Sequence, residues 1–336
     1  MAFEIRRGTN VGGWLSQSKR RGQERRKFFT EADVRRLAGL GFDHIRLPVD
    51  EEQLWDESGR REPEAWELLE GCLDWCEGAG MRVVVDLHIL RTHYFNAPER
   101  PLFTQAGEPK RFAGLWRDLS AGLRGRSRDR VAYELMNEPV ADDARDWNRV
   151  YRFPYEAIRE AEPDRTIVLG SNEWSQAKTF DGLEVPEGDA HLILTFHYYN
   201  SMIITHYRAQ WIRECREYTG PIHYPGTPIS PEDFGRLDGE LQGLLAKWNY
   251  PHDASVMKAE MAAPLAVRER TGLPLYCGEF GVTGATPDAL RAAWCGDVRR
   301  VCEKLGIAWS VWTYKGGFGL YDMDGSATGV VAALTS

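Results

Sequence analysis

Residues 81–138 run from the apolar segment "MRVVVDLH" (81–88), through a helical pattern near Phe112, to a second apolar segment, "RVAYELMNE" (130–138). Each apolar segment has the length and the residue types of a buried strand. The part between them is long enough for the helix that joins two parallel strands. This stretch therefore predicts a strand–helix–strand unit of a parallel sheet.

The same alternation continues in both directions along the chain. Further strand-like segments are "TNVGGWL" (9–15), "FDHIRLPV" (42–49), "RTIVLGS" (165–171), "HLILTFHYY" (191–199), "PLYCGEFGV" (274–282) and "IAWSVWTY" (307–314). Eight strands with interposed helices predict an α/β fold that closes into a (β/α)8 TIM barrel. We find no repeat, low-complexity tract or linker in the sequence, so residues 1–336 are expected to form one domain.

One long break interrupts this alternation after the sixth strand. It covers about residues 200–252 and includes the turn-rich segment "YPGTPISPEDFG" (224–235). The sequence predicts a long loop insertion here, and loops of this length without regular structure are more often functional than accidental.

Composition limits the classes of function. The chain has 336 residues, 43% of them hydrophobic, and a formal net charge of −8, which gives no overall attraction to nucleic acid or to an anionic membrane. No segment approaches the roughly 18–20 apolar residues of a membrane span. The start "MAFEIRRGTNVGGW" lacks the apolar core of a signal peptide, which predicts a cytoplasmic protein, although a chain trimmed of its leader would read the same. The six cysteines form no C-x-x-C pair and are expected to be reduced and buried.

Polar and ring side chains finish nearly every predicted strand. They are Arg46, His88, Asn137, Glu138, Asn172, Glu173, His197, Tyr199, Glu279 and Trp312. In a (β/α)8 barrel the carboxyl ends of the strands face the catalytic mouth, so these side chains are expected to gather there. Any one of them at a wet rim is ordinary, but the whole set indicates a functional site.

Two of these residues, Glu138 and Glu279, are carboxylates on the fourth and seventh predicted strands, which stand across the mouth from each other. A glycosidase needs such a pair, with one protonated carboxyl group and one ionised carboxylate. A separation of roughly 5 Å predicts retention of configuration, whereas roughly 6.5–9.5 Å predicts inversion. The alternative is that both are helix-capping or salt-bridged carboxylates at the rim.

Seven motifs in order carry a resemblance to a known family. They are "NVGGWL" (10–15), "HIRLPV" (44–49), "DLH" (86–88), "LMNEP" (135–139), "FHYY" (196–199), "GEFG" (278–281) and "WSVWTYKGGFG" (309–319). From about residue 8 to about residue 322, the chain resembles glycoside hydrolase family 5, the cellulase-like retaining β-glycosidases. The resemblance implies hydrolysis of β-linked glucosides or gluco-oligosaccharides by a two-glutamate double displacement.

The resemblance also implies a role for each catalytic glutamate. Glu138 would be the general acid/base and Glu279 the nucleophile. Arg46 and Tyr199 would hydrogen-bond the nucleophile and hold it ionised, because donors to a carboxylate lower its pKa.

The remaining candidates would bind the sugar. Asn137 would contact the 2-hydroxyl group, His88 and His197 would line the site, and Trp312 would form the floor beneath the ring under attack. Trp174 is a candidate sugar platform, with ordinary loop packing as its equal alternative. His88 and His197 could also be rim histidines that do not contact substrate.

No metal or other cofactor is expected, because "HILRTH" (88–93) lacks the third ligand of a zinc site. The basic run "KRRGQERRK" (19–27) is read as a solvated loop, or alternatively as a wall that favours anionic sugars. The expected partner is an oligosaccharide or glycoside, and the expected state is a monomer or weak oligomer. The alternatives are a β-mannan or β-1,3-glucan hydrolase, a catalytically silent carbohydrate-binding barrel, and an aldolase-type or phosphate-binding barrel.

Overall fold

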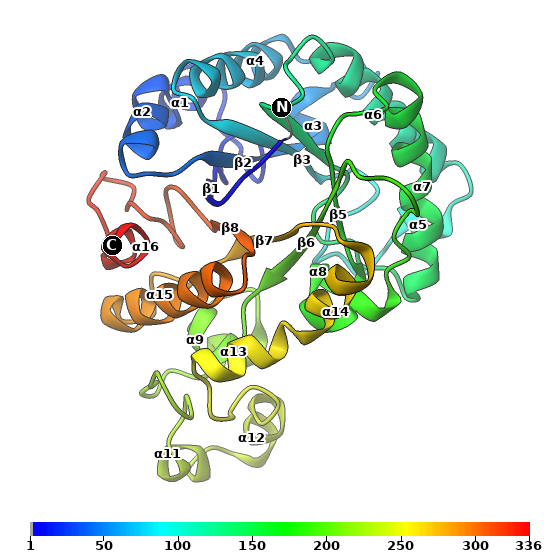
Figure 1. Cartoon of the computed structure of the whole chain (residues 1–336). Coiled ribbons are helices and arrows are strands. Elements are labelled where there is room, and N and C mark those ends of the chain that lie inside the picture. The colour runs from blue at the N-terminus through cyan, green and yellow to red at the C-terminus, as the bar shows by residue number, and fades with distance from the viewer. Residues whose placement is uncertain (1–2) are drawn as a thin grey trace.

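A closed parallel barrel forms the centre of the computed structural model, which describes residues 3–336 (Figure 1). Its strands are β1 (Arg7–Asn10), β2 (His44–Asp50), β3 (Arg82–Ile89), β4 (Val131–Glu134), β5 (Ile167–Gly170), β6 (Leu192–Tyr198), β7 (Leu275–Phe280) and β8 (Ala308–Val311). They pair in chain order, and β1 closes the barrel by pairing with β8. The predicted (β/α)8 barrel is confirmed.

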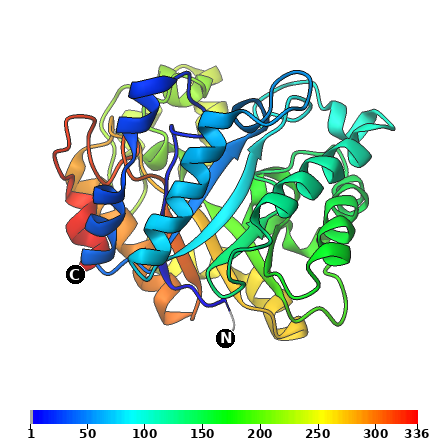
Figure 2. The ribbon, with the colours of Figure 1, turned by 90° about the horizontal axis from the view of Figure 1, so that it is seen from above.

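Helices surround the strands, as Figures 1 and 2 show from two directions. The longer ones are α2 (Glu31–Gly39), α4 (Pro63–Gly78), α6 (Glu108–Leu123), α7 (Ala144–Ala161), α14 (Ala262–Thr271) and α15 (Asp288–Lys304). The shorter ones are α1 (Gly22–Phe28), α3 (Glu51–Leu54), α5 (Pro101–Thr104), α8 (Asn172–Ser175), η1 (Ala177–Gly182), α9 (Met202–Thr205), α10 (Arg213–Glu217), α11 (Pro231–Gly235), α12 (Gly239–Leu245), α13 (Ala254–Glu260) and α16 (Gly329–Thr335).

Local capping explains where two of the longer helices begin. Before α2, the carboxylate of Asp33 accepts hydrogen bonds from the backbone N–H and the hydroxyl of Thr30, at 2.9 and 2.8 Å. Before α4, the carboxylate of Glu62 accepts from the backbone N–H of Ala65 at 2.7 Å. Both contacts satisfy N–H groups that have no partner inside the first turn of a helix.

The barrel interior is filled in layers from its amino-terminal end. Inward-facing strand residues, among them Val84, Ala132 and Tyr276, form an apolar cluster with Phe3 and Ile5 of the N-terminal segment. Successive side chains on a strand alternate between its two faces, so the residues two positions further along form the next layer. That next layer is polar and lies beneath the mouth.

The predicted insertion after β6 is present, and short helices form within it. It contains α9, α10, α11 and α12, and Figure 1 shows α11 and α12 projecting beyond the ring of helices. The insertion has a small core of its own, formed by Ile203, Tyr207, Tyr218, Ile222, Ile229, Leu241 and Leu245. We call residues 199–252 the helical lobe.

Two further properties concern the chain as a whole. All six cysteines are buried and free, as predicted. No helix within residues 3–336 combines the length and the apolar character needed to cross a bilayer.

Candidate active site

Glu138 and Glu279 converge at the mouth of the barrel. Glu279 lies in β7, whereas Glu138 lies four residues beyond the end of β4 at Glu134, so the prediction that it belongs to the strand itself is wrong. Glu138 has a left-handed backbone with φ of 45°, which is uncommon for a residue other than glycine. One carboxylate oxygen from each side chain lies within 4.8 Å of the other.

Both oxygens of Glu279 accept a hydrogen bond. Nη1 of Arg46 donates to Oε1 at 2.6 Å, and the hydroxyl of Tyr199 donates to Oε2 at 2.9 Å. Arg46 is fully buried in β2, and Tyr199 directly follows β6. The two predicted partners of this carboxylate are therefore both in place.

Asn137 is tied to the same arginine. Its Oδ1 accepts from Nη2 of Arg46 at 2.9 Å, which leaves its amide group as a donor. That buried Nδ2 has no hydrogen-bond partner among residues 3–336. An unpaired buried donor is costly, and a substrate hydroxyl group would satisfy it.

His197 lies between the two glutamates. Its Nδ1 is 2.9 Å from Oε1 of Glu138 and 3.7 Å from Oε2 of Glu279. Burial lowers the pKa of His197 well below its ordinary value, and the charges of Arg46 and His88 lower it further. A neutral ring with its proton on Nδ1 can donate only to these carboxylates. His197 therefore lines the site as predicted, and its contact with sugar stays a prediction.

His88 and Trp312 form one wall of the site. Their rings are stacked, with centroids 5.5 Å apart and planes within 6°. Nδ1 of His88 lies 2.6 Å from Oδ2 of Asp86, which fixes the orientation of the imidazole. Trp312 directly follows β8, and a Cβ atom at Gly12 would lie 2.8 Å from its ring, so the glycine of "NVGGWL" is needed for this close approach.

Burial and charge separate the two glutamates. Burial raises the pKa of Glu138 well above its ordinary value, and the charge of Glu279 raises it further. Burial also raises the pKa of Glu279, but the charge of Arg46 and the hydrogen bond from Tyr199 oppose that rise. The predicted lowering by these donors is therefore outweighed by burial. A carboxyl pair in this situation retains one proton over a wide pH range.

Comparisons with known proteins agree with this arrangement of strands. The model of the family described as "Cellulase (glycosyl hydrolase family 5)" matches residues 8–317. The chain belongs to glycosyl hydrolase family 5. It is therefore a glycosidase of the retaining kind, as the resemblance of its motifs implies.

Two of the similar curated proteins match this chain over most of its length. Endoglucanase C of Acetivibrio thermocellus is 30% identical over 312 residues, which cover 92% of this chain and 90% of the relative. Cellodextrinase A of Ruminococcus flavefaciens is 28% identical, with 90% and 84% covered. The solved structure of Thermotoga maritima Cel5A in complex with cellobiose superposes with a TM-score of 0.79 at 22% identity, covering 98% of this chain and 97% of that one.

Trp174 lies at the edge of this family 5 site. Its backbone N–H donates to the carbonyl of Pro139, the residue after Glu138, at 3.3 Å. Its indole nitrogen donates to the carbonyl of Phe95 at 3.0 Å, and 36% of the residue is exposed. A tethered indole with an open face has the form of a sugar platform, but its contact with sugar stays a prediction.

Sequence reasoning missed three buried polar residues beneath the mouth, Asn10, Asp86 and Glu134. All three contact Arg46, at 3.0, 3.0 and 2.7 Å. The alternation of a strand could have identified Asp86, which lies two residues before His88 in β3 and so on the same face. An acidic residue within a strand of apolar residues was the corresponding signal for Glu134.

Two of the six cations in the basic run at residues 19–27 are paired with carboxylates, and neither proposed role fits Arg25. This residue is fully buried in α1 and pairs with Glu62 at 3.0 Å and Glu64 at 3.2 Å. Arg26 pairs with Glu67 at 2.7 Å. The run fastens α1 to α4, so a basic wall for anionic sugars loses two of its arginines.

One group of side chains could hold a metal ion. Atoms of Glu138, His197 and Glu279 lie within 4.8 Å of one another. Neither His88 nor His93 of "HILRTH" belongs to this group. Because Glu138 and Glu279 are the two predicted catalytic residues, a cation bound here would be expected to compete with catalysis.

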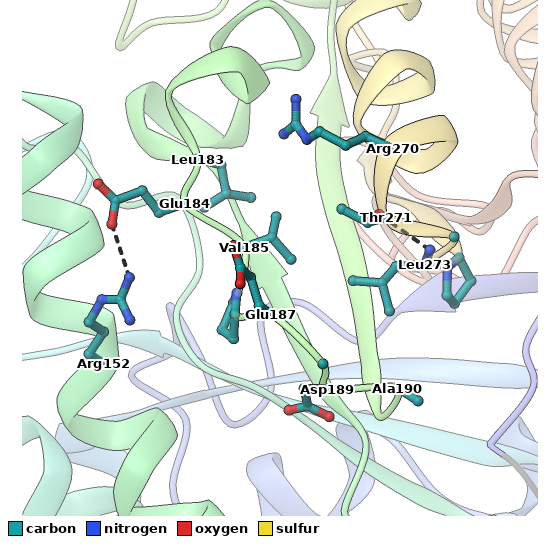
Figure 3. Close-up of a pocket in the computed structure, with 14 residues that line it drawn as sticks. Arg152, Leu183, Glu184, Val185, Glu187, Asp189, Ala190, Arg270, Thr271 and Leu273 are labelled. Carbon is teal, nitrogen blue, oxygen red and sulfur yellow. Dashed lines mark hydrogen bonds and ion pairs between the residues drawn. The ribbon is translucent and has the colours of Figure 1, made fainter.

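A cavity of about 1000 Å³ lies elsewhere on the protein (Figure 3). It is lined by residues 183–190, before β6, and by residues 270–274, before β7. It therefore opens at the amino-terminal end of these strands, opposite to the mouth. The ion pair between Arg152 and Glu184 stands at its edge, and the cavity contains none of the candidate catalytic residues.

Proposed function

We propose that the protein hydrolyses soluble β-linked gluco-oligosaccharides with retention of configuration, using Glu138 as general acid/base and Glu279 as nucleophile. The observation that carries this proposal is the approach of their carboxylate oxygens within 4.8 Å. Burial raises the pKa of both groups, but the charge of Arg46 and the hydrogen bond from Tyr199 oppose the rise at Glu279, whereas the charge of Glu279 adds to it at Glu138. This spacing suits a direct attack by the carboxylate, because inversion needs room for a water molecule between the groups.

In the first step, the ionised carboxylate of Glu279 attacks the anomeric carbon and forms a covalent glycosyl ester. Arg46 and Tyr199 each hold one of its oxygens, which fixes the direction of attack. The bond to the leaving oxygen breaks, and Glu138 gives its proton to that oxygen. Glu138 is then a carboxylate, stabilised by the hydrogen bond from Nδ1 of His197 at 2.9 Å.

In the second step, the same Glu138 carboxylate takes a proton from a water molecule. The hydroxide formed attacks the anomeric carbon, the ester bond to Glu279 breaks, and both side chains return to their starting states. Because two inversions occur in succession, the product keeps the β configuration.

Three side chains support recognition of the sugar. The face of Trp312 offers an apolar floor beside the stacked ring of His88. The unpaired Nδ2 of Asn137 can donate to a hydroxyl group next to the reacting carbon. The substrate class is supported by Endoglucanase C and Cellodextrinase A, whose names both refer to glucans.

Proton NMR of a reaction with cellotetraose tests the proposal. We expect β-anomer signals to appear first and α-anomer signals to follow only as the product mutarotates. A parallel screen of aryl β-glucoside, β-mannoside and β-xyloside should favour the glucoside. Initial formation of the α anomer would refute retention, and a mannoside preference would support the β-mannan alternative. Binding without any hydrolysis would point to a silent carbohydrate-binding barrel.

The helical lobe supports a short binding site. Trp211 of the lobe is 59% exposed, and its ring lies 6.0 Å from that of His206 and 6.3 Å from that of Phe318. The ring of His206 in turn lies 5.2 Å from that of Tyr199, which holds the nucleophile. This chain of rings extends from the catalytic residues to the lobe, so we propose that Trp211 bounds one end of the cleft.

We therefore expect kcat/KM to rise from cellobiose to about cellotetraose and then to level off. Trp211→Ala should lower kcat/KM on cellotetraose about two- to tenfold, since a ring contact of this kind contributes roughly 0.5–1.5 kcal/mol. Trp248→Ala is the matched control, because Trp248 belongs to the same lobe but packs on its core. A steep rise up to cellohexaose, with rapid loss of viscosity on a soluble glucan, would instead show an open cleft.

A further inference from the structure

The guanidinium group of Arg46 is held from behind by a second glutamate. Its Nε and Nη2 donate to the two carboxylate oxygens of Glu134, at 2.7 and 2.8 Å. Both side chains are buried, with 0% and 1% exposed. Two parallel hydrogen bonds fix the plane of the guanidinium group, and they therefore also fix the direction of its remaining nitrogen.

That remaining nitrogen is the one that contacts Glu279. Nη1 donates to Oε1 of Glu279 at 2.6 Å and to Oδ1 of Asn10 at 3.0 Å. Nη2 also reaches Asn137, at 2.9 Å. A rotation of the guanidinium group would therefore displace both of its hydrogen bonds at once, the one to Glu279 and the one to Asn137.

A competing partner for Arg46 lies close by. Oδ2 of Asp86 is 3.0 Å from Nη2 of Arg46, and the same oxygen is 2.6 Å from Nδ1 of His88. If the hydrogen bonds between Glu134 and Arg46 were weakened, the attraction of Asp86 would draw the guanidinium group away from Glu279. The bidentate contact is what keeps Arg46 directed at the nucleophile.

We propose that Glu134 is a positioning residue for hydrolysis: it does not touch substrate, and it aims Nη1 of Arg46 at Glu279. The inference rests on the proposed role of Glu279 as nucleophile. It goes beyond that role by explaining why a second buried carboxylate lies next to a nucleophile whose charge it repels. Burying a carboxylate here costs free energy unless the carboxylate is paired with a cation. The pairing with Arg46 offsets that cost and orients the guanidinium group.

Glu134 acts on Glu279 in two opposing ways. Through space, its negative charge disfavours ionisation of Glu279. Through Arg46, it favours that ionisation, because it keeps a cation 2.6 Å from the nucleophile. Burial raises the pKa of Glu134 to about 7, and the charge of Arg46 opposes the rise.

The groups that face Glu279 from the surrounding elements have to be considered in any pH measurement. They are Arg46 on β2, Asp86 and His88 on β3, Glu134 on β4, Glu138 after β4, His197 on β6 and Tyr199 after β6. All of them except Glu134 itself stay unchanged in a variant that alters only the length of the side chain at position 134.

Glu134→Asp is this variant, since it keeps the charge and withdraws the carboxylate by one methylene group. We expect kcat to fall about 100-fold with KM changed less than about threefold, because the lost interaction orients the nucleophile and does not bind the sugar. We also expect the acidic limb of the pH profile to move up by about one pH unit, because Glu279 loses its nearest cation. An unchanged kcat or an unmoved limb would overturn the proposal.

Glu134→Gln gives a second test, which separates positioning of Arg46 from a simple effect of the charge of Glu134. The two explanations predict opposite shifts of the acidic limb. If Glu134 acted only by its charge, its removal would favour ionisation of Glu279 and move the acidic limb to lower pH. If it positions Arg46, the limb moves to higher pH and kcat falls, because the amide can accept only one of the two hydrogen bonds. A shift to lower pH with kcat retained would overturn positioning. Thermal melting checks that both variants fold.

Glu162→Asp is the matched control. Glu162 makes a similar buried contact to Arg165, at 2.8 Å to Nε and 2.6 Å to Nη2, and it lies after α7 at the other end of the barrel. This variant should lose stability without any movement of the pH profile. Failure of this inference is separable from failure of the proposed function: Glu279→Ala would still lose activity, and the wild-type product would still be the β anomer.

Discussion

Glu279→Ala is expected to lose hydrolysis by on the order of 10⁴-fold or more, and sodium azide is expected to restore cleavage of an activated aryl glucoside. The substitution leaves a small cavity whose donors, Nη1 of Arg46 and the hydroxyl of Tyr199, still point at the missing carboxylate. An azide ion held there attacks the anomeric carbon once, from the face that Glu279 uses. The product should therefore be α-glucosyl azide, of inverted configuration, which NMR distinguishes from its β isomer.

Glu173→Ala provides the control for this experiment. Glu173 follows an asparagine, as Glu138 does, and lies near the mouth after β5, but it is exposed. Its loss should leave kcat/KM within a few-fold of the wild-type value. Near-normal activity of Glu279→Ala, or failure of azide to give the α product, would remove Glu279 from the mechanism.

Most of the residues that could be predicted from the sequence stand near the carboxyl end of a strand or just beyond it. His88, Tyr199 and Glu279 could be predicted because the carboxyl ends of parallel strands meet at one mouth. Arg46 is an exception, since it is the third residue of β2. Asp86, within β3, and Glu134, the last residue of β4, lie one layer deeper than the predicted residues that follow them in the chain. An inspection of strand ends alone passes over that layer, although the alternation of the strand places Asp86 on the face of His88.

The helical lobe shows a limit of a different kind. Its helices have four to seven residues, too few for the spacing of apolar residues that identifies a helix in a sequence. Their starts nevertheless carry local signals: Ser230 accepts from the backbone N–H of Asp233 before α11, and Asp238 accepts from that of Leu241 before α12. Short capped turns of this kind become stable only when they pack together, as they do around the core of the lobe.

Arg25 could not be placed from the sequence because its partners are distant in the chain. Glu62 lies 37 residues further on and Glu64 lies 39 residues further on. Within the run at residues 19–27, nothing distinguishes this arginine from its exposed neighbours. Only the packing of α1 on α4 decides which cation is buried, and charge patterning alone carries no such information.

Glu138→Gln is expected to lower kcat/KM on cellotetraose by about 10³-fold, but that on dinitrophenyl β-glucoside by less than about tenfold. The amide keeps the hydrogen bond to His197 but has no proton to give. A sugar leaving group needs that proton, whereas dinitrophenolate leaves without it. Equal losses on both substrates would show that Glu138 is not the acid. With azide, this variant should form β-glucosyl azide, of retained configuration, because Glu279 still makes the covalent intermediate and azide replaces the water that Glu138 would activate.

The pH dependence of activity on cellotetraose independently tests whether Glu138 is the proton donor. Burial and the charge of Glu279 raise the pKa of Glu138, so in the wild-type protein activity on cellotetraose should be lost as the pH rises through that raised pKa. The glutamine side chain does not titrate, so the basic limb should be absent from the profile of Glu138→Gln. The acidic limb should remain, because Glu279 must still ionise. A basic limb that persisted unchanged in the variant would assign it to another group, and Glu138 would then lose its role as the proton donor.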